Sequence, residues 1–195
     1  MTTMTITRGS LLTLEAYAKI RKTSKAEIIA HRRLRTVHLG EHISVQFEDE
    51  RTIRRQIQEM LHIEKIFDEA GIDSEIEAYA PLVPDGTNWK ATLLLEYPDP
   101  KERHARLAEL KGIEQRTWVQ VGGCERVYAI ADEDLERENE EKTSAVHFLR
   151  FELSLQMVGA LRRGAELTMG ADHPRYQASA RIGPETRSAL VEDLA

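Results

Sequence analysis

An amphipathic stripe between Glu50 and Ala70 restricts the possible folds more than any other segment of this 195-residue chain. At about 100° per residue, one side of a helix over this span gathers six apolar side chains: Ile53, Ile57, Met60, Leu61, Ile63 and Phe67. Gly71 can end such a helix because a residue without a side chain readily adopts the left-handed cap conformation. The stripe therefore predicts one long helix with one face against the core.

Shorter helices are predicted on both sides of it. The N-terminal part favours two, over 14–22 and 25–35, the second beginning at a capping box formed by Ser24 and Glu27. Asp99 can cap another that begins at Pro100. Short helices are also indicated in LQMVGALRRG and from Pro184 onward.

Alternating or β-rich segments predict the strands, which are HISVQF, NWKATLLLEY, AVHFLRFEL, ELTMG and RYQASARI. TVHLG can pair with the first of these as a hairpin, and Gly122-Gly123 suits a two-residue turn between RTWVQV and CERVYAI. Because strands and helices alternate irregularly, we expect an α+β fold. The prediction is a single globular domain over 1–195, with a largely antiparallel sheet, a long central helix and short N- and C-terminal helices.

Composition restricts location and chemistry. No apolar run approaches the roughly 20 residues of a membrane-spanning helix, and the first ten residues lack the apolar core of a secretory signal. The expected location is the cytoplasm, without a membrane partner. The lone Cys124 cannot form an internal disulfide, so redox chemistry by a cysteine pair within one chain is excluded.

Charge is unevenly distributed along the chain. Residues 1–40 carry eight Lys or Arg against two Glu, a net charge of +6, so the overall charge of −6 leaves −12 for the remainder. The run DEDLERENEEK, over Asp132–Lys142, contains seven acidic and two basic residues. A solvated connection is the favoured interpretation of this run, and the alternative is cation binding or docking to a basic surface, such as the N-terminal helices of a neighbouring subunit. This polarity favours a homodimer, and the absence of a nucleic-acid motif argues against a nucleic-acid partner.

Glu59 and His62 in QEMLHIE have the E-x-x-H spacing of helical di-iron sites. A di-iron bundle also needs carboxylates on other long helices and a second E-x-x-H, so we expect neither a metal nor a cofactor here. On the helical wheel His62 falls opposite the apolar stripe and Glu64 falls within it. Since burying an unpaired carboxylate is costly, Glu64 should find a partner.

The strand AVHFLRFEL supplies candidates for that partner. A period of two places Phe148, Arg150 and Glu152 on one face and His147 on the other, apolar face. Arg150 can pair with a buried carboxylate, whereas a lone histidine on an apolar face is more often a core residue than a ligand. The candidate binding residues are therefore Glu64, Arg150, Glu152 and His147, with a structural ion pair as the simpler alternative.

Several long segments together identify a family resemblance, namely HLGEH, FEDERTIRRQIQEMLHIEKIF, YAPLVPDGTNWKATLLLEYPD, YAIADEDLERENEEKTSAVHFLRFEL and MGADHPRY. They resemble the bacterial domain of unknown function family 3501 over nearly the whole chain. The resemblance implies no catalytic residues. It implies a genomic context beside rubrerythrin-like and iron-sulphur oxidoreductase genes, and His62 stands where relatives are expected to carry a basic residue.

Two hypotheses of function follow. The first is a cytoplasmic binding or assembly protein, accessory to a redox or oxidative-stress system and partnered by a redox protein. The second is an enzyme that acts on a small anionic metabolite, with Arg150 orienting the anion and Glu64 or His147 exchanging a proton. The enzyme predicts a pocket where these groups converge around a carboxylate of shifted pKa.

Overall fold

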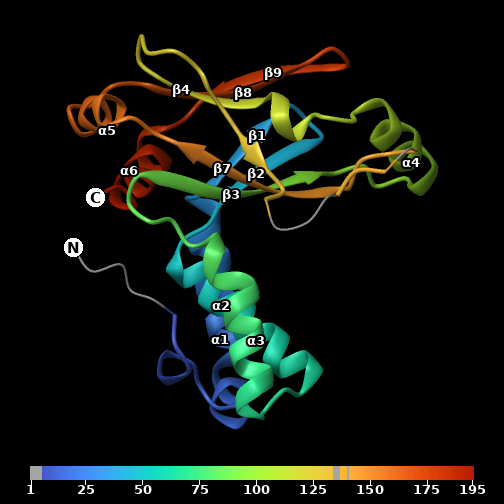
Figure 1. Cartoon of the computed structure of the whole chain (residues 1–195), viewed down its shortest axis with the longest axis vertical. Helices are drawn as coiled ribbons and strands as arrows, with labels where there is room; N and C mark the ends of the chain where they lie inside the picture. The colour runs from blue at the N-terminus through green and yellow to red at the C-terminus, as the bar shows by residue number, and fades with distance from the viewer. Residues whose placement is uncertain (1–5, 134–136, 140) are drawn as a thin grey trace.

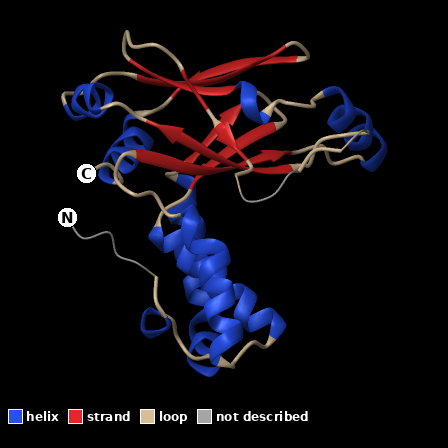
Figure 2. Cartoon of the chain, viewed as in Figure 1, coloured by secondary structure: helices blue, strands red, loops and turns tan. Residues whose placement is uncertain are grey.

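A computed structural model describes residues 6–133, 137–139 and 141–195. The chain forms a β-rich body from which a helical arm projects (Figure 1). Strands occupy the body, and helices make up the arm (Figure 2). The predicted α+β class is confirmed.

Two antiparallel sheets form the body. In the larger sheet the order is β1 (Thr36–Leu39), β2 (Ile43–Phe47), β3 (Asn88–Leu95), β7 (Val146–Glu152) and β6 (Ile130–Ala131). In the smaller sheet it is β5 (Val127–Tyr128), β4 (Thr117–Val121), β8 (Leu167–His173) and β9 (Tyr176–Arg181). Every strand pairing among the described residues is antiparallel, which confirms the expected sheet type.

The main core lies between the sheets, where Leu93 and Phe151 of the larger sheet and Val119 and Met169 of the smaller belong to one buried cluster. Along β7 buried residues alternate with less buried ones, as the sequence predicted. Helices α4 (Pro100–Glu109), α5 (Leu155–Arg162) and α6 (Pro184–Glu192) border the body, and Asp99 caps α4 as expected. Short 3-10 turns cover Arg8–Ser10, Ala80–Leu82 and η3 (Glu114–Arg116).

The arm consists of α1 (Leu14–Arg33), α2 (Glu50–Glu64) and α3 (Glu69–Tyr79). A second, smaller core forms here around Ile6, Ile53, Ile57 and Leu61. The predicted break in the N-terminal helical region is wrong: α1 continues through Ser24, whose hydroxyl accepts from Arg55 instead of capping a helix. None of the described helices is long and apolar enough to cross a membrane.

The predicted end of the long helix is also wrong. Helix α2 ends at Glu64 because Lys65 adopts the left-handed conformation at φ 56°. Asp68 then caps a new helix by accepting from the amide of Gly71, which therefore lies inside α3. The single helix expected from Glu50 to Ala70 is thus two helices joined by a turn.

The hairpin between β4 and β5 is present, and the amide of Cys124 donates to the carbonyl of Val121 at 2.9 Å, which closes the expected turn over Gly122-Gly123, but ladder pairing with β5 does not begin directly at this turn. Val119 pairs with Val127, so the connection is longer than Gly122-Gly123. The Gln120 side chain donates to the carbonyl of Cys124, and Val121 pairs instead with Leu167 of β8. Pairing with β8 therefore continues along β4 after pairing with β5 has ended.

Candidate functional site

The inward face of β7 carries His147, whose side chain is fully buried at 0% exposure. Its Nδ1 lies 2.6 Å from an oxygen of Asp132, and its Nε2 lies 3.0 Å from both the hydroxyl of Thr143 and the carbonyl of Ser144. Both ring nitrogens therefore have polar partners. The burial of His147 on the apolar face is as predicted.

Glu114, the first residue of η3, approaches the same imidazole. Its carboxyl Oε2 lies 3.9 Å from Nε2 of His147, and this buried oxygen has no hydrogen-bond partner. Burial raises the pKa of the Glu114 carboxyl, because the charged form loses its hydration. Glu114 is consequently a buried carboxyl group whose neutral, protonated form is favoured.

Asp132 follows β6 and has an unusual backbone conformation, with φ at 51°. Its second carboxylate oxygen accepts from the amide of Phe148 at 3.0 Å, and it lies 3.3 Å from the guanidinium of Arg137. These contacts fix the carboxylate against the His147 ring. Part of the acidic run Asp132–Lys142 lies outside the described residues, but Asp132 itself, 11% exposed, is not the solvated residue expected there.

A cavity of about 350 Å³ opens beside these groups. Glu114, Asp132 and Glu138 contribute carboxylates to its wall, and Lys111 and Arg137 contribute cations, with Lys111 lying 3.7 Å from Glu138. His147 does not line it, so the imidazole can influence a bound molecule only through the two carboxyl groups. The cavity thus combines cations that could fix an anionic group with a carboxyl group of raised pKa.

The structure does not place Glu64 in this site. Its side chain is exposed, at the end of α2 in the arm, so the prediction that it is buried is wrong. The physical reason is the early end of α2: Ile63 and Phe67, which were expected to share its apolar face, are 62% and 81% exposed. The buried part of the stripe ends at Leu61.

Arg150 and Glu152 do meet, but on the outer face of β7. The guanidinium of Arg150 donates to Glu152 and, at 2.8 Å, to both oxygens of Glu133. His147 points to the opposite face of the strand. Of the four predicted residues, the structure therefore joins two in a half-exposed ion pair and places His147 with Asp132 and Glu114, which sequence reasoning missed.

Glu59 of the E-x-x-H pair belongs to an ionic cluster in the arm. Its carboxylate accepts from Tyr17 at 2.6 Å and from Arg21 at 2.9 Å, and it pairs with Arg55 at 2.5 Å. The hydrogen bonds from Arg21 lower the pKa of Glu59 to about 2. His62 instead contacts the edge of the Tyr17 ring, and no group of three or more metal-ligating side chains occurs in the described parts of the chain.

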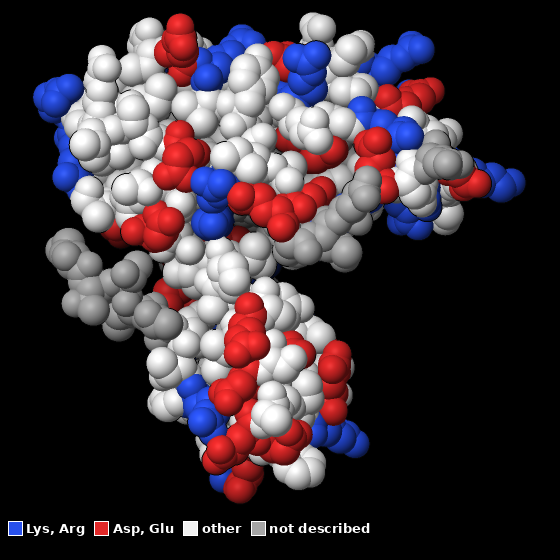
Figure 3. Space-filling model, viewed as in Figure 1, with Lys and Arg blue, Asp and Glu red and all other residues white. Residues whose placement is uncertain are grey.

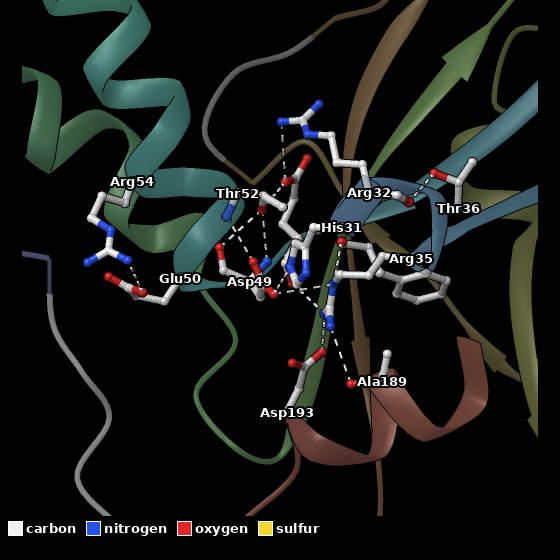
Figure 4. A network of polar contacts seen from close by, with 12 residues as sticks. His31, Arg32, Arg35, Thr36, Asp49, Glu50, Thr52, Arg54, Ala189 and Asp193 are labelled. Carbon is white, nitrogen blue, oxygen red and sulfur yellow. Dashed lines mark hydrogen bonds and ion pairs between the residues drawn. The ribbon is translucent and has the colours of Figure 1, made fainter. Parts of the chain in front are cut away.

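A second buried polar network joins the arm to the body (Figure 4). Arg35, 2% exposed, donates to the carbonyls of Phe47, Glu48 and Ala189 and pairs with Asp193. Asp49 lies 3.5 Å from Arg35 and 2.6 Å from the imidazole of His31. Since its charges are paired within the network, its evident role is to hold α1, α2 and α6 in place.

The fold and cavity define an α+β protein with a helical arm and a buried Glu-His-Asp cluster. The model of a family described as "Protein of unknown function (DUF3501)" matches residues 5–194, and the chain belongs to this family. The chain is also similar to the crystal structure of a novel protein of unknown function from Burkholderia pseudomallei K96243. That structure is 58% identical, with a TM-score of 0.94 over 98% of this chain and 100% of its own. A comparison with curated proteins found no match.

Proposed function

We propose that this protein is an enzyme that acts on a small anionic metabolite by acid-base chemistry in the cavity beside Glu114. The observation that carries the proposal is Glu114, which lines that cavity and whose buried carboxyl oxygen Oε2 lacks a hydrogen-bond partner. A buried polar atom without a partner is costly, so a bound molecule that donates to it would gain affinity.

In this proposal each polar group of the cavity has a distinct role. Lys111 and Arg137 bind the anionic group of the substrate, because both line the cavity. Glu114 is the catalytic residue: its raised pKa suits a group that removes a proton from one atom of the substrate and returns it to another. His147 and Asp132 are positioning residues that orient Glu114 and adjust its charge.

The other hypothesis, an accessory protein of a redox system, stays a prediction, as do its cytoplasmic location, its redox-protein partner and the homodimer. One observation favours a docking role of this kind. Acidic side chains gather on the arm (Figure 3), and among those of α3 and its cap, Asp68, Glu69 and Glu77 are exposed. Affinity capture of the native protein followed by mass spectrometry tests it, and recovery of no redox protein would count against it.

Proton exchange with solvent tests the enzyme directly. The protein is incubated in D2O with pooled small carboxylates and phosphate esters, and loss of carbon-bound proton signals is followed by NMR. An enzyme that abstracts protons should exchange at least one substrate, and Glu114→Gln should reduce that rate by about 100-fold or more, the usual contribution of general acid-base catalysis.

A matched control separates this loss from a general effect of charge. Glu64→Gln makes the same chemical change on an exposed glutamate in the arm and should leave the exchange rate unchanged. If no compound in a broad pool exchanges, or if Glu114→Gln exchanges as fast as the wild type, the proposal is wrong.

A further inference from the structure

A second cavity, of about 320 Å³, lies in the arm between α1 and α2. Arg51, Arg54 and Arg55 line it from α2, with a spacing that places them on one face of the helix. The residues that line this cavity come from other elements than those beside Glu114, so binding here does not depend on the proposed enzyme activity.

The three arginines differ in how firmly they are held. The guanidinium of Arg55 pairs with Glu59, donates to Ser24 at 3.1 Å and lies 5.0 Å from the centre of the Tyr17 ring. Arg51 and Arg54 are 48% and 40% exposed, with carboxylate contacts of 3.7 and 3.4 Å. Such exposed, long contacts contribute little energy, so both side chains can turn to an incoming anion.

The opposite wall contains Glu27, which lies 3.7 Å from Arg51, and apolar side chains that are incompletely covered. Ile28 of α1 is buried, whereas Ile20 of α1 and Leu12 before it are 45% and 44% exposed, although both line the cavity. An apolar body placed here would cover these side chains while its charged end reached the arginines. A ligand of this cavity therefore needs an anionic group for one wall and an apolar part for the other.

We propose that this cavity binds an amphiphilic oxyanion, a molecule with a carboxylate or phosphate at one end and an apolar body. The oxyanion pairs with Arg51 and Arg54, for which planar guanidinium groups are well suited. The apolar body lies against Leu12 and Ile20 and displaces water from them. The arginines of α2 on one side and the exposed apolar side chains of Leu12 and Ile20 on the other define this ligand class.

Calorimetric titration of the full chain with hexyl phosphate, hexanoate, hexanol and inorganic phosphate tests the proposal. Hexyl phosphate or hexanoate should bind at least about tenfold more tightly than inorganic phosphate or hexanol, because only the amphiphilic anions satisfy both walls. If inorganic phosphate binds as tightly as the hexyl compounds, or if neither hexyl anion binds, the proposal is overturned.

Variants assign the binding to this cavity. Arg51→Gln/Arg54→Gln should weaken the binding of the hexyl anions about tenfold or more, whereas Arg106→Gln/Arg181→Gln, an equal charge change at exposed residues of α4 and β9, should not. Ile20→Ser should weaken the hexyl anions and leave inorganic phosphate unaffected. Equal losses from the two arginine pairs would place binding elsewhere and refute the assignment; circular dichroism confirms that each variant is folded.

Discussion

Arg35 offers the most direct test of how the arm is fixed to the body. Replacing it with Met preserves much of the length of the side chain but removes the guanidinium. The substitution takes a charged donor from three backbone carbonyls and leaves Asp49 and Asp193 without their shared cation. His31 still pairs with Asp49, so Asp193 loses the most.

The expected cost follows from burial. The Arg35 side chain is 3% exposed and that of Asp193 is 11% exposed, so water replaces the lost contacts poorly. Removing one partner of a buried ion pair typically costs about 3–5 kcal/mol of unfolding free energy. Because domains of this size are stable by only about 5–15 kcal/mol, Arg35→Met should remove a large share of the total.

Urea denaturation followed by circular dichroism at pH 7 measures this cost. Arg33→Met is the control: Arg33 is exposed at the end of α1, two residues before Arg35, and its loss should change the unfolding free energy by less than about 0.5 kcal/mol. The double variant Arg35→Met/Asp193→Asn should recover part of the loss, because the second change removes the charge left unpaired. A cost below about 1 kcal/mol for Arg35→Met would show that the network does not stabilise the junction.

Three further outcomes are expected. Burial raises the pKa of Asp193 to about 6. The free energy of unfolding of the wild type, relative to that of Asp193→Asn, should therefore fall by up to about 3 kcal/mol as the pH rises from about 3.8 through 6. Parallel urea-denaturation profiles of the two proteins across this range would contradict this expectation. Glu59→Gln should lower the free energy of unfolding by about 1–2 kcal/mol at pH 7, after allowance for solvent screening, and by progressively less as the pH falls toward 2. An equal loss at pH 3 and pH 7 would count against a stabilising role of the ion pairs. Gly170→Ala should lower thermal stability by about 2 kcal/mol or more, because its Cβ would lie 2.4 Å from the Trp118 ring and 2.8 Å from the carbonyl of Ala178; an unchanged melting temperature would show that the neighbours move aside.

Much of the body could be predicted from sequence because its signals are local. In β7 the alternation of polar and apolar residues specifies which side chains face the core, and the structure confirms it. Asp99 and Pro100 likewise specify the start of α4 through a cap and a compatible backbone angle. Each of these signals acts within a few residues, so distant contacts do not alter it.

The end of α2 shows where a periodic pattern misleads. Apolar residues continue at helical spacing after Leu61, but the cap at Asp68 begins a new helix and Lys65 turns the chain between them. Ile72 and Ile76 of α3 then pack against the apolar cluster of the arm. A helical wheel that continues through the turn places Glu64 on the buried face. The reversal of the chain at this turn, not the helical period, determines which residues surround Glu64.

The candidate cluster could be predicted only in part, because its members come from separate elements. The period of β7 indicated that His147 is buried, but the local pattern favoured Arg150 as the residue of that strand that pairs with a buried carboxylate. Asp132 turns inward from a run whose composition favours exposure, through a backbone angle that composition does not reveal. Glu114 lies in a 3-10 turn too short to have a periodic face, so only its tertiary contacts bury it.

The two buried polar clusters differ in a way that indicates which of them serves a function. Around Arg35 each charge has a counter-charge, and the remaining guanidinium donors meet carbonyls, as expected of a network that stabilises the fold. Around His147 the carboxyl of Glu114 has an oxygen without a hydrogen-bond partner, which typically costs about 1–3 kcal/mol. A leucine at this position would avoid that cost in an inert core. Glu114 also lines a cavity together with Lys111 and Arg137, and we propose that a molecule bound there supplies the missing partner.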